Sequence, residues 1–278
     1  MPRADAVAAS IGDAVAAGQR RLAASGCESP RLDAELLAAE VLNPAHPNRG
    51  RLVIDRDAPM PADAAEGYER LLVRREAREP VAYILGRRDF RHLTLAVDPR
   101  VLIPRPETEL LVEVGLSLPA GARVLDIGTG SGAVALALAD ERPELVVRGT
   151  DVSEGALAVA RANARRLGLA VGFARADLLD DDPADAVLAN LPYVPLGAPL
   201  APEITRFEPA GALFAGADGL DVVRRLIGML EPSVALTALE IGPDQAAEVA
   251  GLVDGAGFAQ VEILPDLAGL DRVVVGRR

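Results

Sequence analysis

The chain has 278 residues, 50% of them hydrophobic and 25% charged, which is typical of a globular protein with room for one large and one small domain. Its net charge of −12 disfavours nucleic-acid binding, because an acidic protein repels the phosphate backbone; we expect no direct nucleic-acid partner. One cysteine excludes an internal disulfide and a cysteine-rich metal site, and two histidines are too few for a histidine-based one. The lack of lysine excludes a Walker A loop and a Schiff base. Without a membrane-length apolar run or a signal peptide in the first five residues, we expect a cytoplasmic protein that binds no metal and no membrane.

The first eighty residues have the apolar spacing of amphipathic helices, and they predict a helical domain over residues 1–80. A first helix extends to about Leu22, Pro30 begins a second, and a third runs roughly over residues 61–78. The apolar residues expected on the inner side of the second helix are Leu32, Leu36, Leu37 and Val41. Since this stretch carries no catalytic motif, we expect it to recognise the substrate or to act as a structural cap.

Residues 81–105 predict a linker that contains a β-hairpin. Apolar residues alternate over residues 90–97, and the Asp-Pro-Arg sequence at residues 98–100 predicts a turn into a second strand at residues 101–103. Two prolines then stiffen the approach to the next helix.

The stretch from Val124 to Gly132 reads Val-Leu-Asp-Ile-Gly-Thr-Gly-Ser-Gly, a short buried strand followed by a glycine-rich turn into a helix. Such a turn lets a cofactor lie against bare backbone amides at a helix N-terminus, although a purely structural tight turn has the same composition. The run fits the dinucleotide fingerprint in its Gly/Ala form, but an acid two residues before the first glycine resembles the first motif of S-adenosylmethionine-dependent methyltransferases. The candidate cofactor-binding residues of this stretch are Asp126, Gly128, Thr129, Gly130, Ser131 and Gly132.

Two later strands also end in an acid. Asp151 ends a strand at residues 146–151, where it can accept hydrogen bonds from both ribose hydroxyls of an adenosine. Asp177 ends a strand at residues 171–177, and together with Leu178 it can contact the adenine. Each acid alone fits equally well as a helix N-cap, but three acid-ended strands in succession favour a nucleoside-containing cofactor.

The fourth strand, at residues 185–189, leads into the candidate catalytic residues Asn190, Leu191, Pro192 and Tyr193, of which Asn190 is also a candidate cofactor-binding residue. Ligands of an open parallel sheet bind beyond the carboxyl ends of its strands, so this turn is expected near the glycine-rich turn. Taken alone, it also fits a proline-stiffened loop without a function. The Asn190 side-chain oxygen and a backbone carbonyl can both accept hydrogen bonds from an NH2 group on a planar nitrogen and orient it for methyl transfer. Tyr193 can pack on the planar group and near a sulfonium.

The last third of the chain completes the sheet. A long connection at residues 196–219 precedes a helix, a strand at residues 234–241, another helix and two strands at residues 260–264 and 272–276. The two last strands have no helix-length segment between them, so they are expected to be antiparallel. The sequence therefore predicts an α/β fold resembling Rossmann-like S-adenosylmethionine-dependent methyltransferases. It has a mostly parallel seven-stranded sheet with an antiparallel last strand, a small helical N-terminal domain, a connecting β-hairpin and a catalytic domain over residues 106–278.

Beyond the turn at residues 190–193, several stretches form one pattern: Pro80-Val-Ala-Tyr-Ile-Leu-Gly86, Leu102-Ile-Pro-Arg-Pro-Glu-Thr-Glu109, Leu125-Asp-Ile-Gly-Thr-Gly-Ser-Gly132, Arg206-Phe-Glu-Pro209, Gly216-Ala-Asp-Gly-Leu220 and Asp266-Leu-Ala-Gly-Leu-Asp-Arg272. Over residues 80–278 this pattern resembles the bacterial release factor glutamine methyltransferases, the HemK/PrmC group. The resemblance implies an enzyme with S-adenosylmethionine as cofactor and peptide chain release factors as protein partners. Its reaction is methylation of the side-chain amide of the glutamine in their Gly-Gly-Gln motif. The expected substrate-binding residues are Leu102, Arg105, Asn190, Leu191, Pro192 and Tyr193.

Leu191 departs from the Asn-Pro-Pro-Tyr pattern that the family usually has. Leucine still supplies the backbone carbonyl that the family uses at this place, on a less rigid backbone.

Two alternatives remain. An adenine-specific N6 nucleic-acid methyltransferase uses the same turn, but charge disfavours it. Residues 1–82 hold 13 of the 41 acids and 11 of the 29 arginines, which leaves about −10 on the catalytic part. The other alternative is a nonenzymatic partner protein that retains the fold.

Overall fold

The computed structural model describes residues 9–278, so the predicted start of the helical domain and the first five residues lie outside the described part. The chain divides into two compact units. One runs to Gly86 and includes Ala201–Phe207, and the other consists of Arg87–Leu200 and Glu208–Arg278. Within the described residues, no helix combines the length and the apolar character needed to cross a lipid bilayer.

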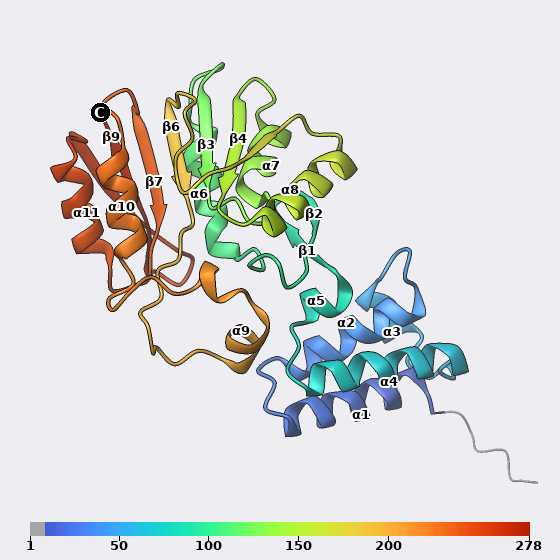
Figure 1. Ribbon diagram of the computed structural model, residues 1–278. Coiled ribbons are helices and arrows are strands. Elements are labelled where there is room, and N and C mark those ends of the chain that lie inside the picture. Colours follow the sequence, from blue (N-terminus) through green and yellow to red (C-terminus); the bar gives the residue numbers. More distant parts are fainter. Residues whose placement is uncertain (1–8) are drawn as a thin grey trace, which may run out of the picture. The chain divides into compact units, whose positions relative to one another are not determined.

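The first unit consists of helices packed around one apolar core (Figure 1). They are α1 (Ile11–Ala24), α2 (Pro30–Leu42), α3 (Arg49–Ile54), α4 (Ala62–Glu76) and α5 (Val81–Leu85). The separate segment adds α9 (Pro202–Phe207), which contributes no residue to this core. Ser10 caps α1 by accepting a hydrogen bond from the Asp13 N–H. Helix α1 lies close to α4 because Gly18 has no side chain: a Cβ there would come within 2.2 Å of the Tyr68 hydroxyl oxygen.

The three predicted N-terminal helices correspond to α1, α2 and α4. The inner side of α2 differs from the prediction: Leu37 is fully buried and Val41 packs against the core, whereas Leu32 is 40% exposed and the half-buried Leu36 is not part of the core. Five residues at about 100° each separate the directions of Leu32 and Leu37 by roughly 140°, so these two leucines do not share a face.

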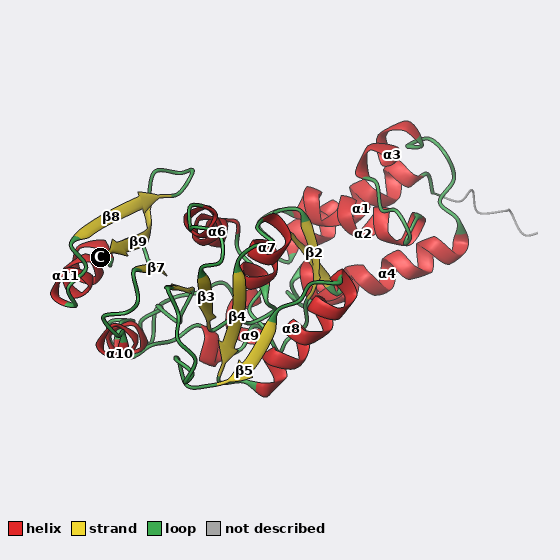
Figure 2. Cartoon of the chain, turned by 90° about the horizontal axis from the view of Figure 1, so that it is seen from above, coloured by secondary structure: helices red, strands yellow, loops and turns green. Residues whose placement is uncertain are grey.

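Seven strands of the second unit form one sheet in the order β5-β4-β3-β6-β7-β9-β8. Figure 1 shows its middle strands, and Figure 2 also labels the edge strands β5 and β8. These strands are β3 (Arg123–Ile127), β4 (Val146–Asp151), β5 (Gly172–Arg175), β6 (Ala186–Ala189), β7 (Leu236–Glu240), β8 (Gln260–Pro265) and β9 (Asp271–Arg277). Strands β5, β4, β3, β6 and β7 pair in parallel, whereas β9 pairs antiparallel with both β7 and β8. The predicted seven-stranded, mostly parallel sheet with an antiparallel last strand is confirmed.

Helices cover both faces of this sheet (Figure 2). On one face lie α6 (Glu109–Leu116), α7 (Ala133–Glu141) and α8 (Glu154–Leu167), and on the other α10 (Asp221–Met229) and α11 (Ala246–Gly255). Consecutive residues of a strand point to opposite faces, so Val124 and Leu188 join the core beneath α6 and α7, while Leu125 and Val187 join the core beneath α10 and α11. Two short 3-10 helices, η1 (Pro106–Thr108) and η2 (Ala210–Ala212), lie in the connections.

The predicted β-hairpin is present, but its turn is not where the sequence predicted it. Strand β1 (Arg87–Phe90) pairs antiparallel with β2 (Leu93–Ala96), so the turn is formed by Arg91 and His92 rather than by residues 98–100. Arg91 has a φ of 50°, the left-handed conformation that tight two-residue hairpin turns need. The apolar alternation over residues 90–97 therefore crosses a turn.

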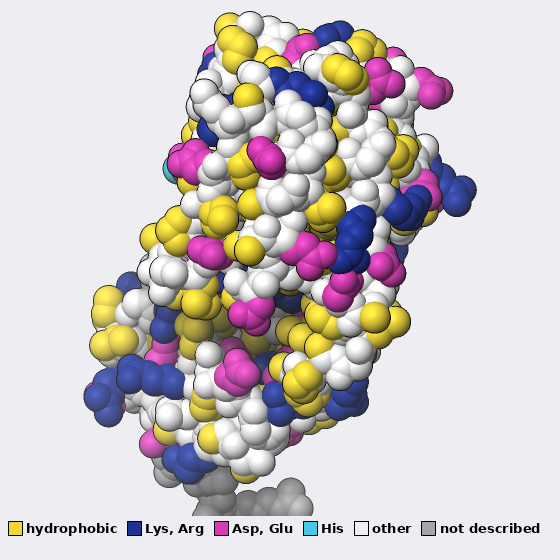
Figure 3. Space-filling view, turned by 90° about the vertical axis from the view of Figure 1, so that its left-hand side faces the viewer, with side chains coloured by type: hydrophobic (Ala, Val, Ile, Leu, Met, Phe, Trp, Pro, Cys, Tyr) yellow, Lys and Arg dark blue, Asp and Glu magenta, His cyan; other side chains and the backbone are white. Residues whose placement is uncertain are grey.

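Arginine and acidic side chains are interspersed on the molecular surface, as the face drawn in Figure 3 shows. Many arginines of the described residues form ion pairs, for example Arg148 with Asp180 and Arg123 with Asp185. This face carries no continuous basic stripe of the kind that follows a phosphate backbone.

Candidate active site

A cavity of about 470 Å³ opens in the second unit beyond the carboxyl ends of β3, β4 and β6. Its wall is formed by the glycine-rich turn, the segments after β4 and β5, the turn after β6, the stretch before η1 and the segment around η2. This is the edge at which open parallel sheets bind their ligands.

The glycine-rich turn has a backbone that only glycine adopts readily. Gly128, Gly130 and Gly132 all have positive φ, and a Cβ on Gly132 would lie 2.9 Å from the Leu136 side chain. The Thr129 N–H donates to the Thr150 carbonyl at 2.9 Å, which ties the turn to β4. The turn can therefore present backbone to a ligand just before α7 begins.

Asp126 stabilises this turn through hydrogen bonds. Its Oδ2 accepts hydrogen bonds from the Thr129 hydroxyl at 2.6 Å and from the Ala135 N–H at 3.2 Å. The residue is only 2% exposed, and burial raises the pKa of its carboxyl to about 7. Asp126 thus links the turn to the first residues of α7 and also lines the cavity.

This buried carboxyl should make the stability of the ligand-free protein depend on pH. The folded-state pKa is raised above the unfolded value, so the stabilisation is present at acidic pH and is lost as the pH rises through about 7. Relative to Asp126→Asn, we expect the wild-type free energy of unfolding to fall by about 2–3 kcal/mol between pH 5 and 8 in urea titrations. Asp181→Asn, at an exposed position, is the control and should follow the wild type. Equal pH slopes for wild type and Asp126→Asn would contradict this role.

Asp151 ends β4 at the cavity wall with a partly exposed carboxylate. Its Oδ2 accepts a hydrogen bond from the Gly130 N–H at 3.0 Å, and its Oδ1 accepts one from the Ser153 N–H at 2.8 Å. Burial raises the pKa of this carboxyl. Each oxygen keeps a lone pair for a ligand hydroxyl.

The next predicted pair, Asp177 and Leu178, also lines the cavity. The exposed Asp177 carboxylate accepts a hydrogen bond from Arg225 of α10 at 2.7 Å. Leu178 has a φ of 77°, unusual for leucine, and its carbonyl accepts a hydrogen bond from the Thr150 hydroxyl at 2.7 Å. That bond holds the Leu178 backbone against β4.

The turn after β6 packs directly on the glycine-rich turn. A Cβ on Gly128 would lie 3.3 Å from the Leu191 side chain, which is itself buried. The Asn190 side chain donates from Nδ2 to the Thr108 hydroxyl oxygen at 2.9 Å. Asn190, Leu191 and Pro192 all line the cavity.

Tyr193 is held away from the cavity wall. Its hydroxyl lies 3.4 Å from Glu240 Oε1, and its carbonyl accepts a hydrogen bond from Gln245 at 2.9 Å. A Cβ on Gly219 would come within 2.1 Å of the same carbonyl oxygen. The contacts of Tyr193 thus fix the backbone that follows Asn190.

Leu102 lines the cavity, whereas Arg105 lies beside it in an ion pair. Arg105 donates to Glu208 Oε1 at 2.5 Å, and the Ile103 N–H donates to Glu208 Oε2 at 3.1 Å. The Glu208 side chain is 1% exposed. This carboxylate therefore ties the proline-stiffened stretch to the segment that continues into η2.

The cavity brings together most of the residues that the sequence indicated: Leu102, Asp126, Gly128, Thr129, Gly130, Ser131, Asp151, Asp177, Leu178, Asn190, Leu191 and Pro192. Gly132, Tyr193 and Arg105 support the wall without lining it. Three further residues of the site, Thr108, Glu208 and Glu240, were not indicated individually by the sequence, although Thr108 and Glu208 lie in stretches that carry the family resemblance. Glu240 had a signal, because it is an acid at the end of an apolar strand, as Asp151 is.

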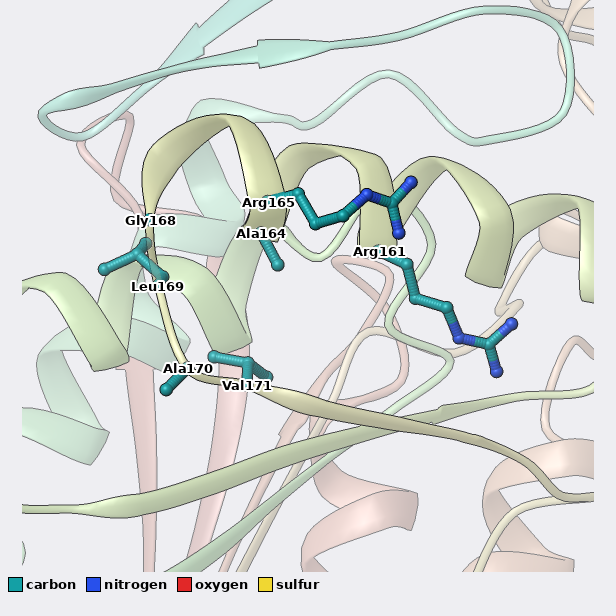
Figure 4. A pocket seen from close by; sticks show the side chains of 7 residues that line it. All are labelled: Arg161, Ala164, Arg165, Gly168, Leu169, Ala170 and Val171. Atoms are coloured by element: carbon teal, nitrogen blue, oxygen red, sulfur yellow. The ribbon is translucent and has the colours of Figure 1, made fainter.

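A second, shallow hollow of about 360 Å³ lies at the end of α8 (Figure 4). The guanidinium groups of Arg161 and Arg165 extend away from the apolar side chains at residues 169–171, and Arg161 also donates to the Phe173 carbonyl. Its lining residues offer no paired acid and base. Within the described residues there is also no group of three or more His, Cys, Asp or Glu side chains that fits a metal ion.

Known proteins are similar to this chain over both of its units. Residues 13–86 match the family model of the PrmC N-terminal domain, and residues 106–200 match that of the methyltransferase small domain. The release factor glutamine methyltransferase of Rhodospirillum rubrum is 42% identical over 274 residues, covering 94% of this chain and 83% of that protein. The one of Neisseria gonorrhoeae is 44% identical over 258 residues, covering 89% and 93%. The solved structure of human methyltransferase 10 domain containing protein, 16% identical with a TM-score of 0.50, covers 66% of this chain and 87% of that one and shares the fold.

Proposed function

The chain belongs to the family of release factor glutamine methyltransferases, and from that premise we propose that it methylates the glutamine of the Gly-Gly-Gln motif in peptide chain release factors. The methyl group goes from S-adenosylmethionine to the side-chain amide nitrogen. The observation that carries this proposal is that Asn190 and the glycine-rich turn open into one cavity. Release factors act in translation, so the reaction belongs in the cytoplasm.

S-adenosylmethionine supplies a methyl group bound to a positively charged sulfur, and the residues of the cavity suit such a molecule. A Cβ on Gly130 would meet no protein atom closer than 3.9 Å, so the turn leaves free space where a ligand can approach the backbone. Asp151 offers acceptors for ribose hydroxyls, and Val152 and Leu178 offer apolar surface for a base. These residues would hold the cofactor.

Replacing Asp151 tests this assignment. Asp151→Ala removes an acceptor for the ligand and for the Gly130 N–H, so S-adenosylmethionine binding should weaken by about 1–3 kcal/mol in titration calorimetry. Asp181→Ala, which removes an exposed carboxylate outside the cavity, should leave the affinity unchanged. Unchanged affinity for Asp151→Ala would refute its role, and tight binding of NAD in place of S-adenosylmethionine would refute the choice of cofactor.

The substrate amide needs orientation more than it needs a base. An amide nitrogen has its lone pair delocalised, so it becomes nucleophilic only when its NH2 is held and polarised. Asn190 Oδ1 and the Leu191 carbonyl are two acceptors on adjacent residues of the cavity wall that can take one hydrogen bond each from that NH2. The nitrogen then gives up a proton as it is methylated or afterwards.

We assign recognition of the release factor to the helical unit. Residues 13–86 match the PrmC N-terminal domain model, and this unit also holds Ala201–Phe207 from the long connection after the Asn190 turn. The net charge of −12 and the mixed surface in Figure 3 favour a protein substrate over nucleic acid.

The direct test is mass spectrometry of a purified release factor before and after incubation with this protein and S-adenosylmethionine. We expect one added methyl group on the peptide that contains the Gly-Gly-Gln motif, and none on a release factor whose motif glutamine is replaced by glutamate. DNA and RNA that contain adenine serve as competing substrates. Methylated adenine together with an unmodified release factor would instead support the nucleic-acid methyltransferase.

A further inference from the structure

A buried carboxylate stands behind the catalytic turn without lining the cavity. Glu240, at the end of β7, is 1% exposed, and its two oxygens face different partners. Oε2 accepts a hydrogen bond from the Thr108 hydroxyl at 2.6 Å, and Oε1 lies 3.4 Å from the Tyr193 hydroxyl. Any effect of Glu240 on the reaction therefore acts through other residues.

The hydrogen bonds of Thr108 have only one consistent direction when Glu240 is ionised. A threonine hydroxyl has one hydrogen, and a carboxylate can only accept, so this hydrogen points to Glu240. The Thr108 oxygen can then only accept from Asn190, so the Asn190 atom that faces it is the NH2 nitrogen, at 2.9 Å. The carbonyl oxygen of the Asn190 amide must lie on the other side of Cγ.

We propose that Glu240 and Thr108 are positioning residues that fix the orientation of the Asn190 amide and leave its oxygen free to accept from the substrate NH2. This inference rests on the proposed function, because only a substrate with an NH2 group needs that oxygen. With the amide turned over, two NH2 groups would face each other and neither could accept. We call the hydrogen-bonded series Glu240–Thr108–Asn190 the relay. The two orientations of the Asn190 amide have nearly equal shape, and the relay selects the one whose oxygen can accept from the substrate NH2.

The charge state of Glu240 decides whether the hydrogen bonds of Thr108 have a single donor–acceptor direction. Burial raises the pKa of Glu240 to about 7, while Arg272 of β9 and the hydroxyls of Thr108 and Tyr193 favour its ionised form and Glu107 of η1 opposes it. A protonated Glu240 can donate to Thr108, whose own hydrogen can then turn toward Asn190. The methyl-transfer rate should accordingly rise with pH through about 7 as Glu240 ionises.

The test compares variants of the full-length protein in single-turnover transfer to a release factor. Thr108→Val keeps the shape but removes the hydroxyl, and we expect the rate to fall by about 10–100-fold, with S-adenosylmethionine affinity within about threefold of wild type. Thr108→Ser, which restores a hydroxyl, should recover most of the rate. If Thr108→Val does not fold, Thr108→Ala removes the same hydroxyl and carries the test.

Thr237 provides a matched control. It is fully buried in β7, the strand that ends in Glu240, and its hydroxyl has no hydrogen-bond partner within the described part of the chain. Thr237→Val should therefore keep the wild-type transfer rate. A similar loss in Thr237→Val and Thr108→Val would mean that the rate reports packing, and it would overturn the relay.

Glu240→Gln separates the relay from a merely structural role. Glutamine cannot ionise in this range, so the rise of the rate through about pH 7 should disappear while the wild-type protein and Thr237→Val keep it. A wild-type protein that methylates release factors, combined with a full-rate Thr108→Val, overturns the relay and leaves the proposed function standing. A wild-type protein without transfer overturns both.

Discussion

Asn190→Ala should lower the rate of methyl transfer to a release factor by about 10²–10³-fold, the usual effect of losing one preorganised polar contact in an active site. In the proposed mechanism the Asn190 oxygen is one of two acceptors for the substrate NH2, and the remaining one, the Leu191 carbonyl, cannot orient the group alone. S-adenosylmethionine affinity should stay within about tenfold, because the glycine-rich turn and Asp151 are untouched. Single-turnover transfer and separate calorimetric titration measure the two effects.

Two further variants sharpen this test. Asn190→Asp adds a negative charge near the sulfonium, which stabilises the reactants more than the transition state, so it should be scarcely faster than Asn190→Ala. Asp181→Ala, which removes an exposed side chain of the second unit outside the cavity, is the control and should leave transfer unaffected. A full rate in Asn190→Ala would refute the mechanism.

The sheet and the cavity were predictable because their signals are local. Each parallel strand is a short apolar run, and the residue types that follow it, an acid, a glycine or the Asn190 turn, are adjacent in the sequence. Parallel packing then brings these strand ends to one edge without any further information. For this reason Asp126, Asp151 and Asn190 were expected together, and all three line the cavity.

The features that the sequence did not indicate depend on pairs of residues that are distant in the chain. Thr108 and Glu240 are 132 positions apart, and Ile103 and Glu208 are 105 apart. No periodicity links such positions, and each residue alone resembles a helix start or the end of a strand. The hairpin turn at Arg91 was hidden for another reason, because an arginine gives no sign that it will adopt a positive φ.

The largest effect on stability should come from Arg75 in the helical unit. Its side chain is 7% exposed, and it donates to Asp33 at 2.7 Å and to Glu203 at 2.9 Å. Arg78 also donates to Glu203, at 2.6 Å, so Glu203 keeps a partner when Arg75 is lost, whereas the described residues give Asp33 no other ion pair. Arg75→Met fills similar volume but leaves a buried carboxylate without compensation.

We expect Arg75→Met to destabilise this unit by about 3–5 kcal/mol, the range for breaking a buried ion pair on one side. Amide hydrogen exchange in peptides from α1, α2 and α4 should accelerate by about 10²–10³-fold. Arg70→Met on the same helix is the control, because within the described residues Arg70 forms an ion pair only with the exposed Glu66, and the substitution should change stability by less than about 0.5 kcal/mol.

The same variant separates the roles of the two units. The cavity residues belong to the second unit, so S-adenosylmethionine affinity of Arg75→Met should stay within about twofold of wild type. Transfer to a release factor should nevertheless fall. The KM for the release factor should rise by a larger factor than kcat decreases, because a partly unfolded helical unit weakens recognition of the protein substrate and leaves Asn190 unchanged. If the helices of this variant exchange rapidly but the KM for the release factor is unchanged, the assignment of recognition to the helical unit is wrong. Binding of the release factor would then not depend on the folded surface of that unit.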